Sequence, residues 1–257
     1  MIPMVGTTWG EIQRNMNLMC TYLKTIDMST LIYLSVQFDI IQMAWHAAQI
    51  NDKHLLLNLI QRGEDIEKRG GEPVPSTPLQ IAAQHQDCSV LKILLEHGAN
   101  TEAVDCLGRT VLHTASFEGR IRVVTLLLFY GANVRTKSND GKCAIHFAVE
   151  KGRLDVIEKL IANRADVSAA DNHGWTPLHY AAEKQKEDVI FTLLLANAKM
   201  TRTKQGLTPS DVARHMGRIK LARELDRVSV LQGGERSLHA APRRTPEHQD
   251  TSVHHFY

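Results

Sequence analysis

Pairs of apolar residues recur along the middle of the chain at a fixed distance. From Val90 to Leu95, apolar residues stand at positions i, i+1, i+4 and i+5, which places their side chains on one face of a helix. The pairs that close such stretches lie 33 residues apart: Leu94 and Leu95, Leu127 and Leu128, Leu160 and Ile161, and Leu193 and Leu194. The pattern predicts a series of similar helices, one in each unit of 33 residues.

The start of each unit carries a second landmark with the same period. A string similar to Thr-Pro-Leu-His precedes each apolar stretch. Its first residues are Thr77, Thr110, Cys143 and Thr176, each 33 residues apart, and Thr208, which follows after 32. A Thr side chain can accept a hydrogen bond from a free N–H group at a helix start, and Pro fits the first turn because it has no N–H group. Each string therefore predicts a short first helix, which precedes the apolar second helix.

Glycine marks the end of the second helix in two units. Gly98 and Gly131 follow the apolar pairs and predict the left-handed residue that commonly ends a helix. Arg164 stands at the same position of the next unit, and that unit also lacks the Thr-Pro pair at its start. We therefore expect residues 142–165 to be the least stable part of the array.

Together, these residues resemble the ankyrin repeat family, whose motif reads roughly Asp-x-x-Gly-x-Thr-Pro-Leu-His-x-Ala-Ala and closes with Leu-Leu-x-x-Gly-Ala. The resemblance implies a mainly α solenoid, in which helix-turn-helix units stack and hairpin fingers connect them. Full repeats are expected at 76–108, 109–141, 142–174 and 175–206, with divergent capping repeats at 42–75 and 207–228. Residues 1–41 are expected to form an apolar, partly helical segment, and residues 229–257 a disordered tail.

Histidine recurs inside the motif, which raises the question of a metal site. Equivalent positions in stacked helices lie about 8 to 10 Å apart, whereas zinc needs nitrogen ligands at about 2.0 to 2.1 Å. The histidines therefore do not share an ion, and we expect neither a metal nor a cofactor. In the ankyrin family this histidine makes hydrogen bonds within and between hairpins. The resemblance thus implies a structural role for Thr77, Thr110, His113, His146, Thr176 and His179.

Composition and motifs exclude several classes of function. The chain has 30 basic and 28 acidic residues, a net charge of +2, which is too balanced for a protein that coats nucleic acid. No stretch of 18 or more uncharged residues occurs in the apolar N-terminal region, so no membrane span is expected. Catalytic motifs such as His-Glu-x-x-His and Gly-x-Ser-x-Gly do not occur, so we expect no enzyme and no small-molecule substrate. Nucleic acid binding is favoured only by a basic cluster: Arg135, Lys137, Lys142, Arg164, Lys199, Arg202 and Lys204.

Cysteine usage indicates a reducing compartment. The cysteines are widely spaced and include no Cys-x-x-Cys pair, so neither a zinc site nor a secreted disulfide framework is indicated. We therefore expect the protein in the cytoplasm or the nucleus. The four cysteines are Cys20, Cys88, Cys106 and Cys143.

The family resemblance also implies where partners bind. In ankyrin proteins, partners usually contact the finger tips and the exposed side of the first helices, which line a concave groove. Large aromatic side chains such as Trp175 and Phe117 are typical of interface hot spots, although Trp175 could equally pack against its neighbouring finger. The implied partner-binding set is Leu107, Arg109, Phe117, Lys142, Glu150, His173, Trp175 and Glu183.

The leading hypothesis is a non-catalytic protein-protein interaction module, an adaptor or scaffold that holds a protein partner on its concave face. The alternative is a regulatory inhibitor or subunit that masks an enzyme or a transcription factor. Nucleic acid binding is the third hypothesis, and a salt titration separates it because phosphate contacts weaken steeply with salt.

Overall fold

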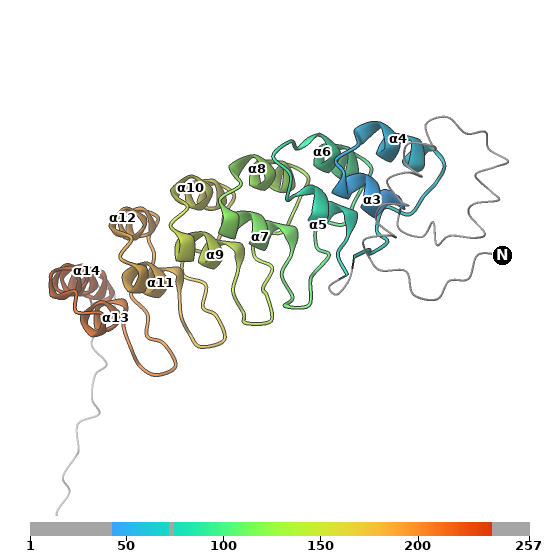
Figure 1. Cartoon of the computed structure of the whole chain (residues 1–257). Coiled ribbons are helices and arrows are strands. Elements are labelled where there is room, and N and C mark those ends of the chain that lie inside the picture. Colours follow the sequence, from blue (N-terminus) through green and yellow to red (C-terminus); the bar gives the residue numbers. More distant parts are fainter. Residues whose placement is uncertain (1–42, 72–74, 238–257) are drawn as a thin grey trace, which may run out of the picture.

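The computed structural model describes residues 43–71 and 75–237, and the regular elements in these ranges are helices that follow one another in pairs (Figure 1). The expected segment 1–41 and the end of the expected tail, 238–257, lie outside the described residues. The first helices of the pairs are α3 (Met43–Gln49), α5 (Pro78–Ala82), α7 (Val111–Glu118), α9 (Ala144–Lys151), α11 (Pro177–Lys184) and α13 (Pro209–His215). The second helices are α4 (Lys53–Gln61), α6 (Ser89–Glu96), α8 (Ile121–Phe129), α10 (Leu154–Ala162), α12 (Glu187–Leu195) and α14 (Ile219–Ser237).

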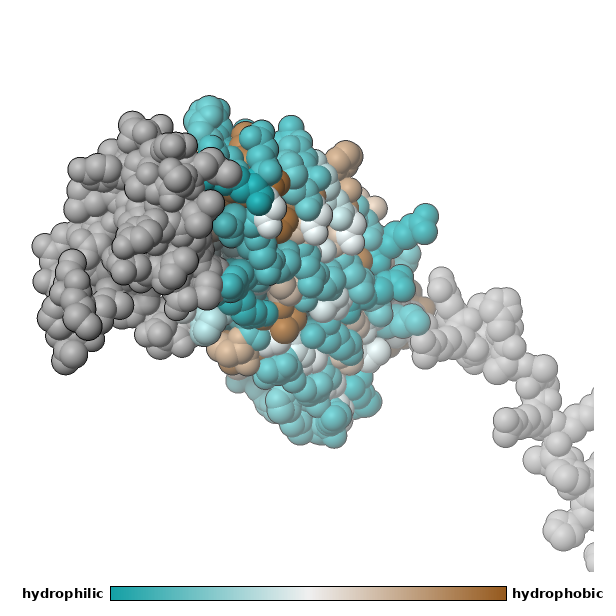
Figure 2. Space-filling model, turned by 90° about the vertical axis from the view of Figure 1, so that its right-hand side faces the viewer, coloured by the Kyte–Doolittle hydropathy of each residue, from teal (hydrophilic) through white to brown (hydrophobic). Residues whose placement is uncertain are grey.

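The helices form two layers that run side by side along the array. First helices make one layer and second helices make the other, and the fingers project from the layer of first helices (Figure 1). The array bends so that the first helices and fingers lie on its inner side (Figure 1). Seen from the N-terminal end, the described surface is largely hydrophilic, with isolated hydrophobic residues (Figure 2). This arrangement confirms the mainly α solenoid that the sequence predicts.

The hydrophobic core lies between the two layers. Alanines on the first helices, such as Ala115 and Ala148, are 2% and 0% exposed, and their small size lets neighbouring helices approach closely. Burial of one leucine side chain contributes about 1.5 to 3 kcal/mol, so each repeat adds a similar increment of stability. In the four full repeats, the core leucine of the second helix is fully buried, at 0% exposure: Leu94, Leu127, Leu160 and Leu193.

The last helix is longer than the sequence pattern predicts. Helix α14 continues to Ser237, past residue 228, after which a disordered tail was expected. Its inner residues, Leu221 and Leu225, are buried at 9% and 1% exposure, whereas Val230 is 73% exposed. The apolar period ends where the helix no longer has a packing partner. The helix itself continues beyond that point through its backbone hydrogen bonds.

Each motif histidine joins its own helix start to the following finger. The Thr110 N–H group donates to Nδ1 of His113 at 3.0 Å, and Nε2 of His113 lies 3.0 Å from the carbonyl oxygen of Thr136. Because an N–H group only donates and a carbonyl only accepts, the ring is neutral and carries its proton on Nε2. The same bonds recur from Cys143 through His146 to Ala169, and from Thr176 through His179 to Leu207.

Gln80 reproduces this connection in the first full repeat. Its Oε1 accepts a hydrogen bond from the Thr77 N–H group at 2.9 Å, and its Nε2 donates to the Ala103 carbonyl at 3.3 Å. The Thr77 hydroxyl accepts from the Gln80 N–H group, as the N-cap pattern predicts. The hydroxyl of Thr110 instead lies 2.9 Å from Nδ1 of His113, because the ring nitrogen offers it a second partner.

Burial changes the protonation of these histidines. Loss of hydration disfavours the charged ring, and a proton on Nδ1 would face the N–H group that donates to it. The pKa of His146 is lowered from 6.5 to about 4. Burial also lowers the pKa of His113 and of His179. The folded array therefore holds these side chains neutral.

Neighbouring fingers are joined through their backbones. The Asn139 N–H group donates to the Leu107 carbonyl at 3.1 Å, and the Asn172 N–H group donates to the Asp140 carbonyl at 3.0 Å. A Cβ atom on Gly141 would lie only 2.8 Å from the backbone nitrogen of Asn172. Glycine is required at this position so that the next finger can approach.

The unit at residues 142–174 keeps the left-handed turn without a glycine. Arg164 has a φ of 64°, close to the 80° of Gly98 and the 84° of Gly131. A Cβ atom makes this conformation unfavourable. At the start of the same unit, the Cys143 N–H group donates to Nδ1 of His146 as Thr110 and Thr176 do to their histidines, so this half of the helix cap is kept without the hydroxyl. The helix start is therefore less weakened than the sequence pattern suggests.

Replacing Arg164 with glycine removes this strain. We expect the free energy of unfolding to rise by about 0.5 to 1 kcal/mol, because the greater freedom of glycine in the unfolded chain offsets part of the gain. Urea unfolding measures the change, and amide exchange in residues 142–165 should slow relative to residues 109–132. The matched control is Gly131→Arg, where nothing lies within 4 Å of the added Cβ and a loss of similar size is expected. If the free energy of unfolding did not rise and amide exchange in residues 142–165 did not slow, the strain argument would be contradicted.

Acidification from pH 6.5 toward pH 4 should lower the free energy of unfolding. In this window the unfolded chain, with histidine pKa values near 6.5, binds more protons than the folded chain, in which the pKa of His146 is about 4. The stability is complete above pH 6.5 and falls as the pH approaches 4. His146→Gln removes one titrating group while keeping both hydrogen bonds, as Gln80 does, so we expect a shallower dependence. Urea unfolding across this pH range tests the prediction. If the free energy of unfolding fell with pH as steeply in His146→Gln as in the wild type, His146 would be excluded as a source of the pH dependence.

Candidate binding surface

Four aromatic side chains form a row on the inner side of the array, which we call the aromatic row. They are Phe117 on α7, Phe147 on α9, Tyr180 on α11 and Trp175 on the finger before α11. The ring centroids of Phe117 and Phe147 lie 6.4 Å apart, edge to face, and those of Trp175 and Tyr180 lie 5.1 Å apart. Such ring pairs stabilise one another beyond their burial. Phe147 is only 9% exposed, so the surface of the row is formed chiefly by the half-buried rings of Phe117, Trp175 and Tyr180.

Lys142 connects the two halves of the row. Its Nζ lies 4.6 Å from the ring centroid of Tyr180 and 5.7 Å from that of Phe147. The same ammonium group lies 3.3 Å from Oε2 of Glu150, and the two side chains are 18% and 28% exposed. A partly buried cation between aromatic faces and a carboxylate is held more firmly than a surface lysine.

The finger sequence explains why Lys142 points this way. Asp105 and Asp171 occupy equivalent finger positions, and Ser138 stands at the position between them. Asp105 holds the basic residue of its own finger, Arg109, whereas Ser138 offers Lys142 no carboxylate. The ammonium group of Lys142 therefore pairs with a carboxylate on α9 instead.

Asp171 fixes the orientation of Tyr180. Its Oδ2 accepts a hydrogen bond from the Tyr180 hydroxyl at 2.7 Å, and its Oδ1 accepts from the N–H groups of His173 and Trp175, each at 2.8 Å. Burial by itself raises the pKa of Asp171, but these donated bonds outweigh it and lower the pKa. Burial first, and then the bond to Asp171, raise the pKa of Tyr180. The hydroxyl thus stays a donor, and the ring cannot turn away from the row.

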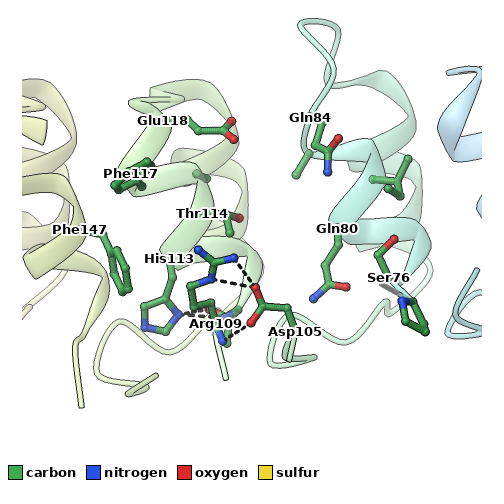
Figure 3. Close-up of a pocket in the computed structure, with 15 residues that line it drawn as sticks. Ser76, Gln80, Gln84, Asp105, Arg109, His113, Thr114, Phe117, Glu118 and Phe147 are labelled. Carbon is green, nitrogen blue, oxygen red and sulfur yellow. Dashed lines mark hydrogen bonds and ion pairs between the residues drawn. The ribbon is translucent and has the colours of Figure 1, made fainter. Parts of the chain in front are cut away.

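A shallow hollow of about 450 Å³ lies beside the row, between α5 and α7 (Figure 3). Its walls include Gln80, Gln84 and Phe117, and its floor carries the ion pair of Arg109 with Asp105, whose NH2 and Oδ2 atoms are 2.8 Å apart. Asp105 also accepts hydrogen bonds from the N–H groups of its own finger. Burial alone raises the pKa of Asp105, but the bonds from Arg109 and the finger lower it.

The structure brings together some members of the partner-binding set that the sequence implies. Phe117, Lys142, Glu150 and Trp175 belong to the row or contact it, and Arg109 lines the adjacent hollow. Glu183 on α11 is half-buried and lies 3.1 Å from Nζ of its neighbour Lys184. The remaining two members lie at the tips of separate fingers: Leu107, which is 52% exposed, and His173, which is also exposed.

The Trp175 ring packs against its own repeat and is also partly exposed to solvent. This half-buried ring lies 5.9 Å from the His179 ring and packs on Tyr180, so it stabilises its own repeat. Phe147 and Tyr180 are absent from the sequence-derived set, although both stand three residues after the start of their helices. The equivalent residues Ile81 and Thr114 line the adjacent hollow, so the position directly after the motif histidine, or after Gln80, faces the inner side.

Within residues 43–71 and 75–237, no group of three or more His, Cys, Asp or Glu side chains could hold a metal ion. In the same part of the chain, no helix is long and apolar enough to cross a bilayer.

Comparison with known proteins places the chain among repeat proteins. The family model for ankyrin repeats (3 copies) matches residues 44–138 and 130–204. The chain is also similar to palmitoyltransferase akr1 of Neurospora crassa, with 33% identity over 77 residues. That match covers 30% of this chain but only 10% of the relative, so it spans a small part of that protein. The repeat matches and the stacked helix pairs together show that the chain belongs to the ankyrin repeat family.

Proposed function

We propose that this protein is a non-catalytic adaptor or scaffold that holds a protein partner on its aromatic row. Ankyrin repeats generally mediate protein-protein interaction. The observation that carries the proposal is the row itself, because its rings are fixed by Lys142, Glu150 and Asp171 before any partner arrives. A preorganised aromatic surface loses little entropy on binding and is typical of interface hot spots.

The shape of the surface favours a macromolecular partner. The row extends over α7, α9 and α11, and the hollow beside it is shallow and carries paired charges. Small-molecule sites usually enclose most of their ligand, whereas protein partners cover broad surfaces with a few aromatic anchors. A segment of a protein lying along the inner side would contact several repeats at once.

The other hypotheses have weaker support. Several members of the basic cluster are engaged within the protein: Lys142 pairs with Glu150, Lys137 donates to the Ala170 carbonyl, and Arg202 donates to the Gly206 carbonyl. Lys142 also lies over the Tyr180 ring and so belongs to the aromatic surface, which favours a protein partner. A regulatory subunit that masks an enzyme or a transcription factor would use the same surface. It differs from an adaptor only in which site of the partner it covers. We place the adaptor in the cytoplasm or the nucleus, on the cysteine spacing alone.

The name of the Neurospora crassa relative describes acyl transfer by that protein. The similarity lies within the ankyrin region, so it supports a shared repeat architecture and gives no ground for proposing acyl transfer by this chain.

The central test compares two phenylalanines on opposite sides of the array. Phe117→Ala removes one member of the aromatic row, and we expect it to weaken partner binding by about tenfold or more, as loss of a hot spot does. Phe129→Ala is the matched control, because Phe129 on α8 is 80% exposed and lies outside the row. Melting followed by circular dichroism confirms that both variants remain folded.

The partner is first identified by photo-crosslinking. Benzoylphenylalanine replaces Glu183 on the inner face or Glu158 on the outer helix α10, and proteins joined to position 183 alone are purified. Their affinity is then measured by calorimetry for the wild type and both variants. Equal losses for Phe117→Ala and Phe129→Ala, or crosslinks from position 158 alone, would overturn the proposed surface.

A further inference from the structure

A second hollow, of about 590 Å³, lies at the edge of the array where the turns of three repeats meet. It shares Phe117 with the aromatic row, so the two surfaces adjoin. We call it the basic hollow. Its lining includes His85 and Cys88 before α6, Glu118, Arg120 and Arg122 around the start of α8, and Lys151 and Arg153 before α10.

The charges around the basic hollow are unbalanced. Four lining residues are cations, and Glu118 is the one carboxylate among the lining residues. Glu118 forms an ion pair with Nε of Arg120, so each neutralises the other. Arg122, Lys151 and Arg153 then leave an excess of positive charge around one cavity. Like charges held close together repel, and an anion in the cavity would relieve the repulsion.

The cations are held in place by the preceding repeat. NH1 of Arg120 donates to the Gln84 carbonyl at 2.5 Å, and Nε of Arg153 donates to the Phe117 carbonyl at 3.5 Å. The Arg153 side chain also lies against Gly119, where an added Cβ would meet its Cδ at 2.6 Å. Glycine at position 119 therefore makes room for this arginine, and Arg120 and Arg153 are positioned before a ligand binds.

Lys151 links the hollow to the aromatic row. Its Nζ lies 4.4 Å from the ring centroid of Phe117, which forms one end of the row. A partner segment that covers this ring therefore reaches the cations at the same time. The anion that binds there is best carried by the protein partner itself.

We propose that the basic hollow binds a phosphate group, carried by a phosphorylated serine or threonine of the protein partner. A phosphomonoester carries a charge of about −1.5 to −2 at neutral pH and three acceptor oxygens, which match several cations. A carboxylate carries one charge and two oxygens, and would leave most of the excess unbalanced. Arginine is suited to this role because its guanidinium group can donate two parallel hydrogen bonds to phosphate. The identity of the carrier rests on the proposed function, whereas the phosphate site does not.

Nuclear magnetic resonance titration with O-phospho-L-threonine tests the site directly. We expect saturable shifts of the backbone amides at residues 119–123 and 151–153. Removing a charge-assisted contact commonly weakens binding by about tenfold, so Arg122→Gln and Arg153→Gln should each do so. Lys220→Gln, which removes an exposed cation from α14, is the matched control and should leave the affinity unchanged. Lys151→Gln provides a third variant should Arg153→Gln prove unfolded by circular dichroism.

Two further measurements define the ligand. Glutamate, titrated in the same way, should bind at least several-fold more weakly, and added salt should weaken phosphothreonine binding. No saturable shift, equal weakening by Lys220→Gln, or glutamate binding as tightly as phosphothreonine would overturn the phosphate site. Once the crosslinked partner is purified, phosphatase treatment should lower its affinity for the wild type but not for Arg122→Gln. If the wild type did not bind phosphothreonine but its partner binding still depended on Phe117, this inference alone would be refuted. If it bound phosphothreonine but its partner binding did not depend on Phe117, the proposed function alone would be refuted.

Discussion

The hydrogen bond from each motif imidazole to the carbonyl of the next finger holds the array together. One neutral ring satisfies the N–H group at its helix start and the carbonyl of the following hairpin, so a local turn and a contact between repeats depend on the same side chain. The bond is shielded from water, because His146 and His179 are fully buried at 0% exposure. Without this bond the finger would shift, and neither the aromatic row nor the backbone hydrogen bonds between neighbouring fingers would keep their geometry.

The chemistry of the inner face arises where single residues depart from this repeated frame. Ser138 takes the place of an aspartate and so releases Lys142 toward Glu150 and two aromatic rings. Trp175 takes the place of a basic residue, and the neighbouring Asp171 is then available to the Tyr180 hydroxyl. Because the frame is unchanged, each substitution alters the surface without altering the fold.

The same frame places the basic hollow next to the aromatic row. Arg120 and Arg153 stand at equivalent positions and each reaches back to a carbonyl of the preceding repeat. The cations serve the stacking of repeats and also accumulate charge along one edge. Phe117 lies between the two surfaces and contacts both Phe147 and Lys151. The proposed adaptor surface on the inner side and the proposed phosphate site at the edge thus adjoin at Phe117.

The sequence by itself determined the repeat period, the helix pairs and the structural role of the motif residues, because each follows from spacing within one unit. Gly98 and Gly131 could be assigned to left-handed turns for the same reason. The end of α14 was misplaced, since loss of the apolar period reports loss of a packing partner and not the end of a helix. Only the tertiary structure decided that Phe147 and Tyr180 join Phe117, that Lys142 pairs with Glu150, and that the cations of neighbouring turns share a hollow. The contacts among the rings and among the cations join residues about 30 positions apart, and their geometry depends on how far each repeat is rotated against the next, which no single repeat encodes. Lys142 and Glu150 lie within one repeat, and only the folded side chains show that they pair.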